Sequence, residues 1–371
     1  MFKNNKKYWI ISGILVFLVY FFFATQPIPL ENILEPRWLA SLESGFAINM
    51  GGSPPETGAI IPFYYGNRFG YIDDAGQFIL NRIQGETQNL AVNQALFGTY
   101  LSFSPHSWAE YEVMPSSIEV FNPHNQLLMT INEPDGYPVF LDGRTYIISS
   151  EQNAVSSLDN FGNVRWTYTF PAILTAIDAA AGFFLAGTLD GAIELIDDSG
   201  SQIFSFEPGG SRHAVIVGCA ISSDGSRLAI ISGIDEQRFL LIEKAGDNFR
   251  VMYHEFLFSG FRRPVQIQFI ENNNKIAFER NNGIGIYDMA SRTSIIIPIE
   301  DEIVAMDSGH SRYLFVIGSN GMQKNLICIK MPGEIVFSAP FSSEAVFLER
   351  RDSRIYVGGD QGIISFELGK R

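Results

Sequence analysis

Cysteine and histidine are scarce in this sequence. Its 371 residues include two cysteines, Cys219 and Cys328, and five histidines spread along the chain. Each cysteine lies in an apolar run typical of a buried strand, and their wide separation argues against a disulfide, which needs Cα atoms within about 7 Å of each other. The histidines and cysteines also lack the spacing of a metal-ligand motif. We therefore expect neither a disulfide nor a metal site.

Catalytic motifs are missing as well. The sequence contains no Gly-x-Ser-x-Gly nucleophile elbow and no phosphate-binding Walker loop, and the glycines of residues 358–362 (GGDQG) fit a turn between strands. Acidic residues are numerous, as on a solvated surface. We expect no catalytic residue, no cofactor and no enzymatic activity.

Basic residues are outnumbered by acidic ones. The chain has 26 Lys and Arg against 40 Asp and Glu, which gives a formal net charge of −14. The first 25 residues carry only positive charge, at Lys3, Lys6 and Lys7, so the remainder is more acidic still. Such a surface repels a phosphate backbone, and we expect no nucleic-acid partner.

Stretches rich in Ala, Glu, Leu and Lys, the residues that favour helices, are also rare. Hydrophobic residues make up 46% of the chain, and 31 Phe and 14 Tyr are among its residues. This content is ample for a buried core, and aromatic and β-branched residues favour strands. The composition therefore predicts an all-β protein.

One long apolar segment lies near the N-terminus. Residues 8–25 (YWIISGILVFLVYFFFAT) are uncharged and mostly apolar, and a helix of this length spans about 27 Å of a hydrocarbon core about 30 Å thick. Lysines precede it and acids follow it, so we expect residues 1–7 in the cytoplasm, a single-pass anchor in the inner membrane, and a periplasmic domain after a tether at residues 26–40. The alternative is a cleaved signal peptide and a secreted protein, although bulky Phe22 stands where cleavage needs a small residue.

A repeated turn runs along the rest of the chain. In each instance an apolar strand ends in a polar residue, Gly or a substitute follows three positions later, and a second strand begins. Asp or Asn at the first position can bond the backbone two residues on, and Gly supplies a positive φ at little cost. These features predict hairpin turns, which recur about every 40–45 residues. The turns are at residues 73–76, 122–125, 159–162, 197–200, 243–246, 288–291, 330–333 and 367–370.

A second hairpin of matching form lies upstream of several turns, at residues 219–231, 267–278 and 345–357. Each period thus holds four short strands, which indicates a β-propeller of four-stranded blades over residues 41–371. Eight blades are preferred, and seven are possible if one turn is spurious. Because the chain ends after the third strand of the eighth blade, we expect residues 45–50 to supply the fourth strand and close the ring.

These repeats carry a family resemblance. Residues 159–166 (DNFGNVRW) and 187–204 (GTLDGAIELIDDSGSQIF) resemble the repeat of PQQ-like (pyrroloquinoline-quinone-like) propellers, in which a strand and an Asp-and-Gly turn precede a Trp. The hairpin at residues 223–225 (SDG) is similar to those of WD-repeat and TolB-type propellers. The sequence departs from the quinoprotein pattern at Phe161, where that turn has Thr, and only one blade keeps the Trp. The resemblance implies the shape of this superfamily and its scaffold functions.

Two links between strands carry aromatic and basic side chains. One is residues 104–116, expected as an unusually long link between the second and third strands of the second blade, and the other is residues 258–264, between the fifth and sixth blades. In a four-stranded meander both emerge on the same face, and aromatic and Arg side chains dominate binding hot spots. The alternative is that the aromatics pack on their own blades and the arginines pair locally. The candidate partner-binding residues are Trp108, Tyr111, Met114, Phe261, Arg262 and Arg263.

We expect the protein to act as a protein–protein interaction scaffold in envelope or membrane-complex assembly. Its partners would be other proteins, with membrane contact through residues 8–25. In architecture it resembles the propeller subunit of the outer-membrane barrel assembly machinery. The alternative is a quinoprotein-like enzyme or a small-ligand sensor that uses the central channel, but the chain has only four Trp with which to stack such a cofactor.

Overall fold

The computed structural model describes most of the chain and divides it into two compact units. One unit comprises Met1–Glu35 with Leu368–Arg371, and the other comprises Pro36–Glu367. The described residues are 15–17, 32–43, 47–50, 58–65, 68–83, 99–246, 248–258, 260–309, 311–351 and 353–370.

Residues 15–17 are helical, and the rest of the expected anchor at residues 8–25 lies outside the described residues. Within the described part of the chain, no helix is long and apolar enough to cross a membrane.

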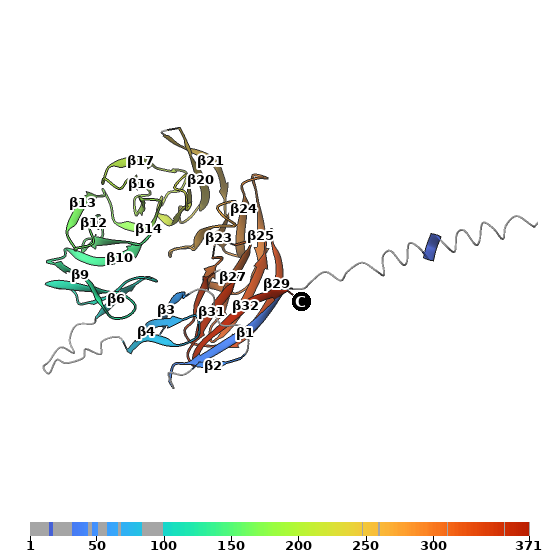
Figure 1. Ribbon diagram of the computed structural model, residues 1–371. Helices are drawn as coiled ribbons and strands as arrows, with labels where there is room; N and C mark the ends of the chain where they lie inside the picture. The colour runs from blue at the N-terminus through green and yellow to red at the C-terminus, as the bar shows by residue number, and fades with distance from the viewer. Residues whose placement is uncertain are drawn as a thin grey trace, which may run out of the picture. The chain divides into compact units, whose positions relative to one another are not determined.

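The described strands form eight sheets, which follow one another around a centre as the blades of a propeller (Figure 1). In six blades the four strands are antiparallel and adjacent in chain order. Blade 1 contains β3 (Ile60–Tyr65), β4 (Arg68–Asp73) and β5 (Phe78–Ile83), and blade 2 contains β6 (Tyr100–Phe103), β7 (Trp108–Tyr111), β8 (Ser117–Phe121) and β9 (Leu127–Asn132). Blade 3 contains β10 (Gly136–Leu141), β11 (Arg144–Ser149), β12 (Ala154–Leu158) and β13 (Val164–Thr169). Blade 4 contains β14 (Leu174–Ala180), β15 (Phe183–Thr188), β16 (Ile193–Ile196) and β17 (Gln202–Phe206). Blade 5 contains β18 (Ile216–Ile221), β19 (Arg227–Ser232), β20 (Arg238–Ala245) and β21 (Asn248–Phe256), and blade 6 contains β22 (Ile267–Ile270), β23 (Lys275–Arg280), β24 (Gly283–Asp288) and β25 (Thr293–Pro298). Blade 7 contains β26 (Glu302–Asp307), β27 (Tyr313–Asn320), β28 (Gln323–Lys330) and β29 (Glu334–Ser342). Blade 8 contains β30 (Phe347–Arg351), β31 (Arg354–Gly359), β32 (Gly362–Lys370), β1 (Asn32–Ser41) and β2 (Ala47–Asn49).

The repeated turns connect the last two strands of the blades, as the sequence predicts for seven of the eight turns. In blade 3 the carboxylate of Asp159 accepts hydrogen bonds from the backbone N–H groups of Phe161 (2.8 Å) and Asn163 (2.9 Å), and Gly162 takes a φ of 86°. The eighth expected turn, residues 367–370, is wrong because this segment continues β32.

The N-terminal part of the chain completes blade 8, in the strand order β2-β1-β32-β31-β30. The strand next to β32 is β1, so the expectation that residues 45–50 take this place is wrong. Instead, β2 pairs outside β1 as a fifth strand, with Trp38 opposite Asn49. The expected tether at residues 26–40 therefore overlaps a strand, and residues 26–31 lie outside the described residues.

The core consists of apolar layers between neighbouring blades. Phe239 of blade 5 stacks on Phe278 of blade 6 with ring centroids 4.5 Å apart, and both side chains are buried. Blade 8 contacts blade 1 through Trp38, whose Nε1 donates to the carbonyl of Asp74 (2.8 Å), a carbonyl that also accepts from Arg354 (2.7 Å). Closure of the ring thus combines apolar packing with directed hydrogen bonds.

Candidate partner-binding surface

The meander gives the propeller two chemically different faces. Links between the second and third strands of a four-stranded blade, and links from one blade to the next, emerge on one side, which we call the link face. Links between the first and second strands and between the third and fourth strands emerge on the other side, which we call the turn face.

Residues 104–116 do not form one long link on the link face. The strand Trp108–Tyr111 (β7) interrupts the segment, which leaves two short connections. Trp108 is 1% exposed, and its ring lies against Phe121 (centroids 4.9 Å apart) and Phe69 of blade 1 (5.1 Å). The expectation that Trp108 is a loop side chain is wrong, because the strand directs this large apolar ring into the layer between blades 1 and 2.

Tyr111 and Met114 have different environments. Tyr111 is half-buried and stacks on Tyr100 of its own blade (5.9 Å), and this burial raises the pKa of its hydroxyl. Met114 lies in the link between β7 and β8, is 88% exposed and has a φ of 55°. Of the three residues expected in this segment, only Met114 presents its whole side chain to solvent.

The link between blades 5 and 6 contains the other expected residues. Arg263 forms two hydrogen bonds with buried Glu279 (3.0 and 2.5 Å), lies 3.3 Å from Glu302, and sits over the ring of half-buried Phe261. Local pairing, the alternative expected from sequence, therefore describes Arg263 and Phe261. Arg262 is exposed on the link face.

Exposed apolar side chains favour the link face. Among the large hydrophobic residues that are exposed in the described links between strands, six emerge on this face, Phe161 emerges on the turn face, and Met50 lies at the end of β2, where the chain leaves blade 8 for blade 1. Val113 and Met114 are neighbours in one link, and Ile173 and Leu189 share a backbone hydrogen bond (2.8 Å), and contiguous exposed apolar groups of this kind are typical of interaction surfaces. The six are Val113, Met114, Ile173, Leu189, Phe258 and Met322.

A hollow of about 800 Å³ lies beside Met114, at the boundary of blades 2 and 3. Its lining includes the exposed carboxylates Glu133, Asp135 and Glu151, which lie in two neighbouring links of the same face. Sequence reasoning missed these three acids, because they are not adjacent in the chain and only the meander brings them together.

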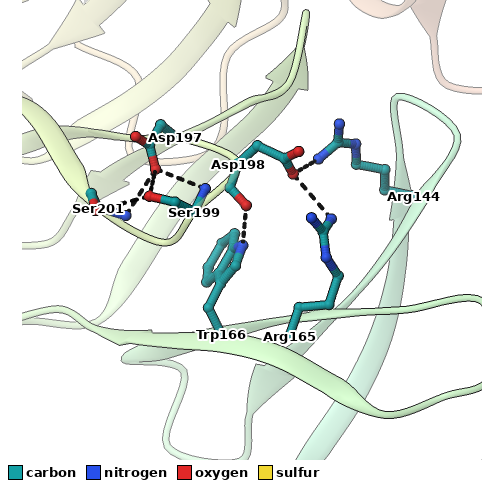
Figure 2. A network of polar contacts seen from close by, with 7 residues as sticks. All are labelled: Arg144, Arg165, Trp166, Asp197, Asp198, Ser199 and Ser201. Atoms are coloured by element: carbon teal, nitrogen blue, oxygen red, sulfur yellow. Dashed lines mark hydrogen bonds and ion pairs between the residues drawn. The ribbon is translucent and has the colours of Figure 1, made fainter.

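The turn face, in contrast, uses its polar groups to join blades. Trp166 and Arg165 of blade 3 reach the turn of blade 4, where the Trp166 Nε1 donates to the carbonyl of Asp198 (3.1 Å) (Figure 2). The Asp198 carboxylate accepts from Arg165 (3.0 Å) and from Arg144. Partial burial would raise the pKa of Asp198, but these two guanidinium groups outweigh it and lower the pKa. These contacts connect blade 3 to blade 4 on the turn face.

Carboxylates at the innermost strands also join blades. Asp178 of β14 accepts a hydrogen bond from the backbone N–H of Ile221 in the next blade (2.7 Å), and Asp307 of β26 accepts one from Arg350 (2.6 Å). Burial raises the pKa of Asp178 to about 6, against the effect of these hydrogen bonds, and it raises that of Asp307 as well. Perturbed pKa values can mark catalytic groups, but these two carboxylates bind backbone of the neighbouring blade.

Comparison with known proteins agrees with this architecture. A protein of Treponema pallidum (strain Nichols), described as uncharacterized, is 29% identical over 312 residues, which cover 82% of this chain and 78% of that protein. BamB from Moraxella catarrhalis has a similar structure, with a TM-score of 0.55 at 12% identity, over 92% of this chain and 99% of that one. The computationally designed Ika8 protein gives a TM-score of 0.59 at 13% identity, over 84% and 96%. Residues 1–370 match a family described as beta-propeller protein, and the chain therefore belongs to this β-propeller family.

Proposed function

We propose that this protein is a membrane-anchored, extracytoplasmic scaffold that binds other proteins through the link face of its propeller, in the assembly of envelope or membrane complexes. The observation that carries the proposal is the one-sided distribution of exposed apolar side chains, such as Met114, Phe258 and Met322. Exposed apolar side chains contribute to the free energy of binding when a partner covers them and removes them from water.

Three further features support a binding role. The inner-strand carboxylates Asp178 and Asp307 serve as links between blades, which favours a structural role for the centre of the ring. The turn face uses Asp198 for the same purpose. The apolar sequence of residues 8–25, with lysines before it, supports an anchor that leaves the propeller outside the cytoplasm.

Site-specific photo-crosslinking in cells tests the proposal. A photoreactive residue at Met114, on the link face, should form adducts with a defined partner protein that mass spectrometry identifies. The same residue at Phe161, which is comparably exposed but lies on the turn face, is the matched control. Adducts from Phe161 alone, or none from any of the six link-face positions, would contradict the proposal.

A further inference from the structure

The hollow between blades 2 and 3 has walls from both blades. On one side is the link 112–116 of blade 2, and on another are the links 133–135 and 149–153. The remaining wall is the side of blade 3 that faces blade 2, where Thr167 and Thr169 of the outer strand β13 are exposed. At the link face, therefore, blade 2 leaves part of this sheet surface uncovered.

One edge of the hollow is apolar. Met114 and Val113 are 88% and 53% exposed at the tip of the link, and Pro115 and Ala154 add apolar surface to the lining. Methionine is unbranched and polarizable, so it adapts to partners of different shape. This edge favours contact with an apolar side chain of a partner.

The rest of the lining is acidic. Glu133, Asp135 and Glu151 all line the hollow, and no Lys or Arg is among the described residues that do so. On the other side of link 112–116, a second hollow of about 730 Å³ is lined by Glu110, Glu112 and Glu119, and Arg82, the one Lys or Arg among the described residues of this lining, lies 3.6 Å from Glu110. Charge complementarity across an interface therefore requires a positively charged occupant.

The backbone around the hollow is fixed in an uncommon conformation. Met114, Glu133 and Gln152, one in each of the three bordering links, have φ values of 55°, 48° and 58°. Residues with these side chains adopt left-handed backbone at a cost of about 1–3 kcal/mol, and such backbone occurs in tight turns and at functional sites. Each of the three links that border the hollow thus makes a tight turn there.

We propose that this hollow is the docking site for a lysine- or arginine-bearing segment of a partner protein, whose cations contact Glu133, Asp135 and Glu151 while an apolar side chain packs on Met114. The inference rests on the proposed scaffold function and names the chemistry of the partner at that surface. The acidic lining selects the cationic segment, and the apolar edge distinguishes such a segment from a simple cation.

A direct binding measurement tests this inference on the full chain in non-ionic detergent. The probe is a short fluorescent peptide of lysine and serine with one central methionine, followed by fluorescence anisotropy at low ionic strength. The triple variant Glu133→Gln, Asp135→Asn, Glu151→Gln should weaken binding about tenfold or more, because each substitution removes one complementary charge. The reversed variant, with lysine at these three positions, should bind a peptide in which glutamate replaces lysine.

The matched control removes three exposed carboxylates from other blades of the same face. The triple variant Glu207→Gln, Glu236→Gln, Glu300→Gln has the same net charge, and it should change the Kd by less than about threefold. Met114→Ser should weaken the methionine peptide but not a peptide with serine at its centre. Equal losses in the two triple variants would show attraction to net charge alone, and this outcome would overturn the inference.

Two other outcomes would also overturn it: no peptide binding at all, or competition by spermidine at the same concentration as the peptide, which would indicate a site for any cation. Crosslinking from Met114 in cells keeps the two proposals apart. If Met114 still crosslinks to a partner protein while the lysine peptide fails to bind, the scaffold function stands and only the partner chemistry is wrong.

Discussion

Trp108 and Met114 are close in the sequence and opposite in environment. The Trp108 ring fills the layer between blades 1 and 2, and its Nε1 donates to the carbonyl of Asn122 (3.0 Å). The Met114 side chain extends into solvent from the next link. Residue type alone predicts a binding role for both, since Trp and Met are each enriched at interfaces. Burial separates a residue that stabilises the fold from one that is available to a partner.

This difference predicts opposite effects of truncation. Trp108→Ala should lower the free energy of unfolding by about 3–5 kcal/mol, because it leaves a cavity between two blades. Met114→Ala should change it by less than about 0.5 kcal/mol, because the side chain makes few contacts within the fold. Denaturant titration of both variants checks the prediction. A Trp108→Ala protein as stable as the wild type would mean that this ring does not pack as the structure shows.

Asp178 gives stability a specific pH dependence. Burial raises its pKa from 3.8 to about 6 in the folded chain, and nearby Asp142 acts in the same direction. The neutral form is therefore favoured on folding. The protonated Asp178 carboxyl contributes to the free energy of unfolding. This contribution is fully present below about pH 4 and is lost as the pH rises through about 6. Asp178→Asn should thus raise stability at pH 8, by up to about 3 kcal/mol, and give no gain at pH 4.

Unfolding midpoints of wild type and Asp178→Asn across this pH range measure the effect. The amide oxygen of Asn can still accept the hydrogen bond from the Ile221 N–H, so the contact between blades 4 and 5 is retained. Glu236→Gln, at an exposed carboxylate of blade 5, controls for the loss of one negative charge. A constant difference between wild type and Asp178→Asn at all pH values would contradict the assignment.

At the scale of elements, the repeated turn was the strongest signal in the sequence. In such a turn the Asp or Asn side chain bonds to backbone only a few residues away, as Asp159 does, and a Gly such as Gly162 takes the positive φ. The turn can therefore be predicted from a short stretch of sequence, without knowledge of the rest of the fold. The closing strand was harder to identify. Its partner β32 is more than 300 residues away in the sequence, and Pro36 makes the segment look like a tether.

The corrected closure predicts where N-terminal truncation becomes harmful. Deletion of residues 1–31 retains β1, and the product should unfold cooperatively and remain monomeric. Deletion of residues 1–41 removes the packing of Trp38 and Ala40 in the core layer and the ion pair of Arg37 with Glu367 (2.7 Å). It also exposes an edge of blade 8, so this product should lose cooperativity or aggregate. Size-exclusion chromatography and thermal melts compare the two, and indistinguishable behaviour would show that β1 does not close the ring.

At the scale of the whole molecule, the sequence was sufficient for the architecture but not for the surface. Four strands per period and the first seven periods follow from local turn chemistry; the predicted count of eight blades is correct, although the turn expected at residues 367–370 is part of β32. The hollow between blades 2 and 3 depends on three links that are distant in the chain, such as those of Met114 and Glu151. No local pattern marks residues that only the closed meander brings together. The same limit explains why Arg263 looked available in the sequence although it pairs with Glu279.

Membrane topology is the remaining whole-molecule property, and it determines which partners the link face can meet. Lys3, Lys6 and Lys7 precede the apolar residues 8–25, and the positive-inside rule then predicts an extracytoplasmic propeller. A reporter active only in the cytoplasm should be silent when fused after Arg371, and one active only after export should give full signal. Replacement of the three lysines by glutamate should reduce the export signal, because it removes the charge asymmetry that orients the segment.

Membrane fractionation of the same fusions separates a retained anchor, which stays with the membrane, from a cleaved signal peptide, which releases the propeller. Strong activity of the cytoplasmic reporter would overturn this topology, and any partner captured at Met114 would then have to be cytoplasmic.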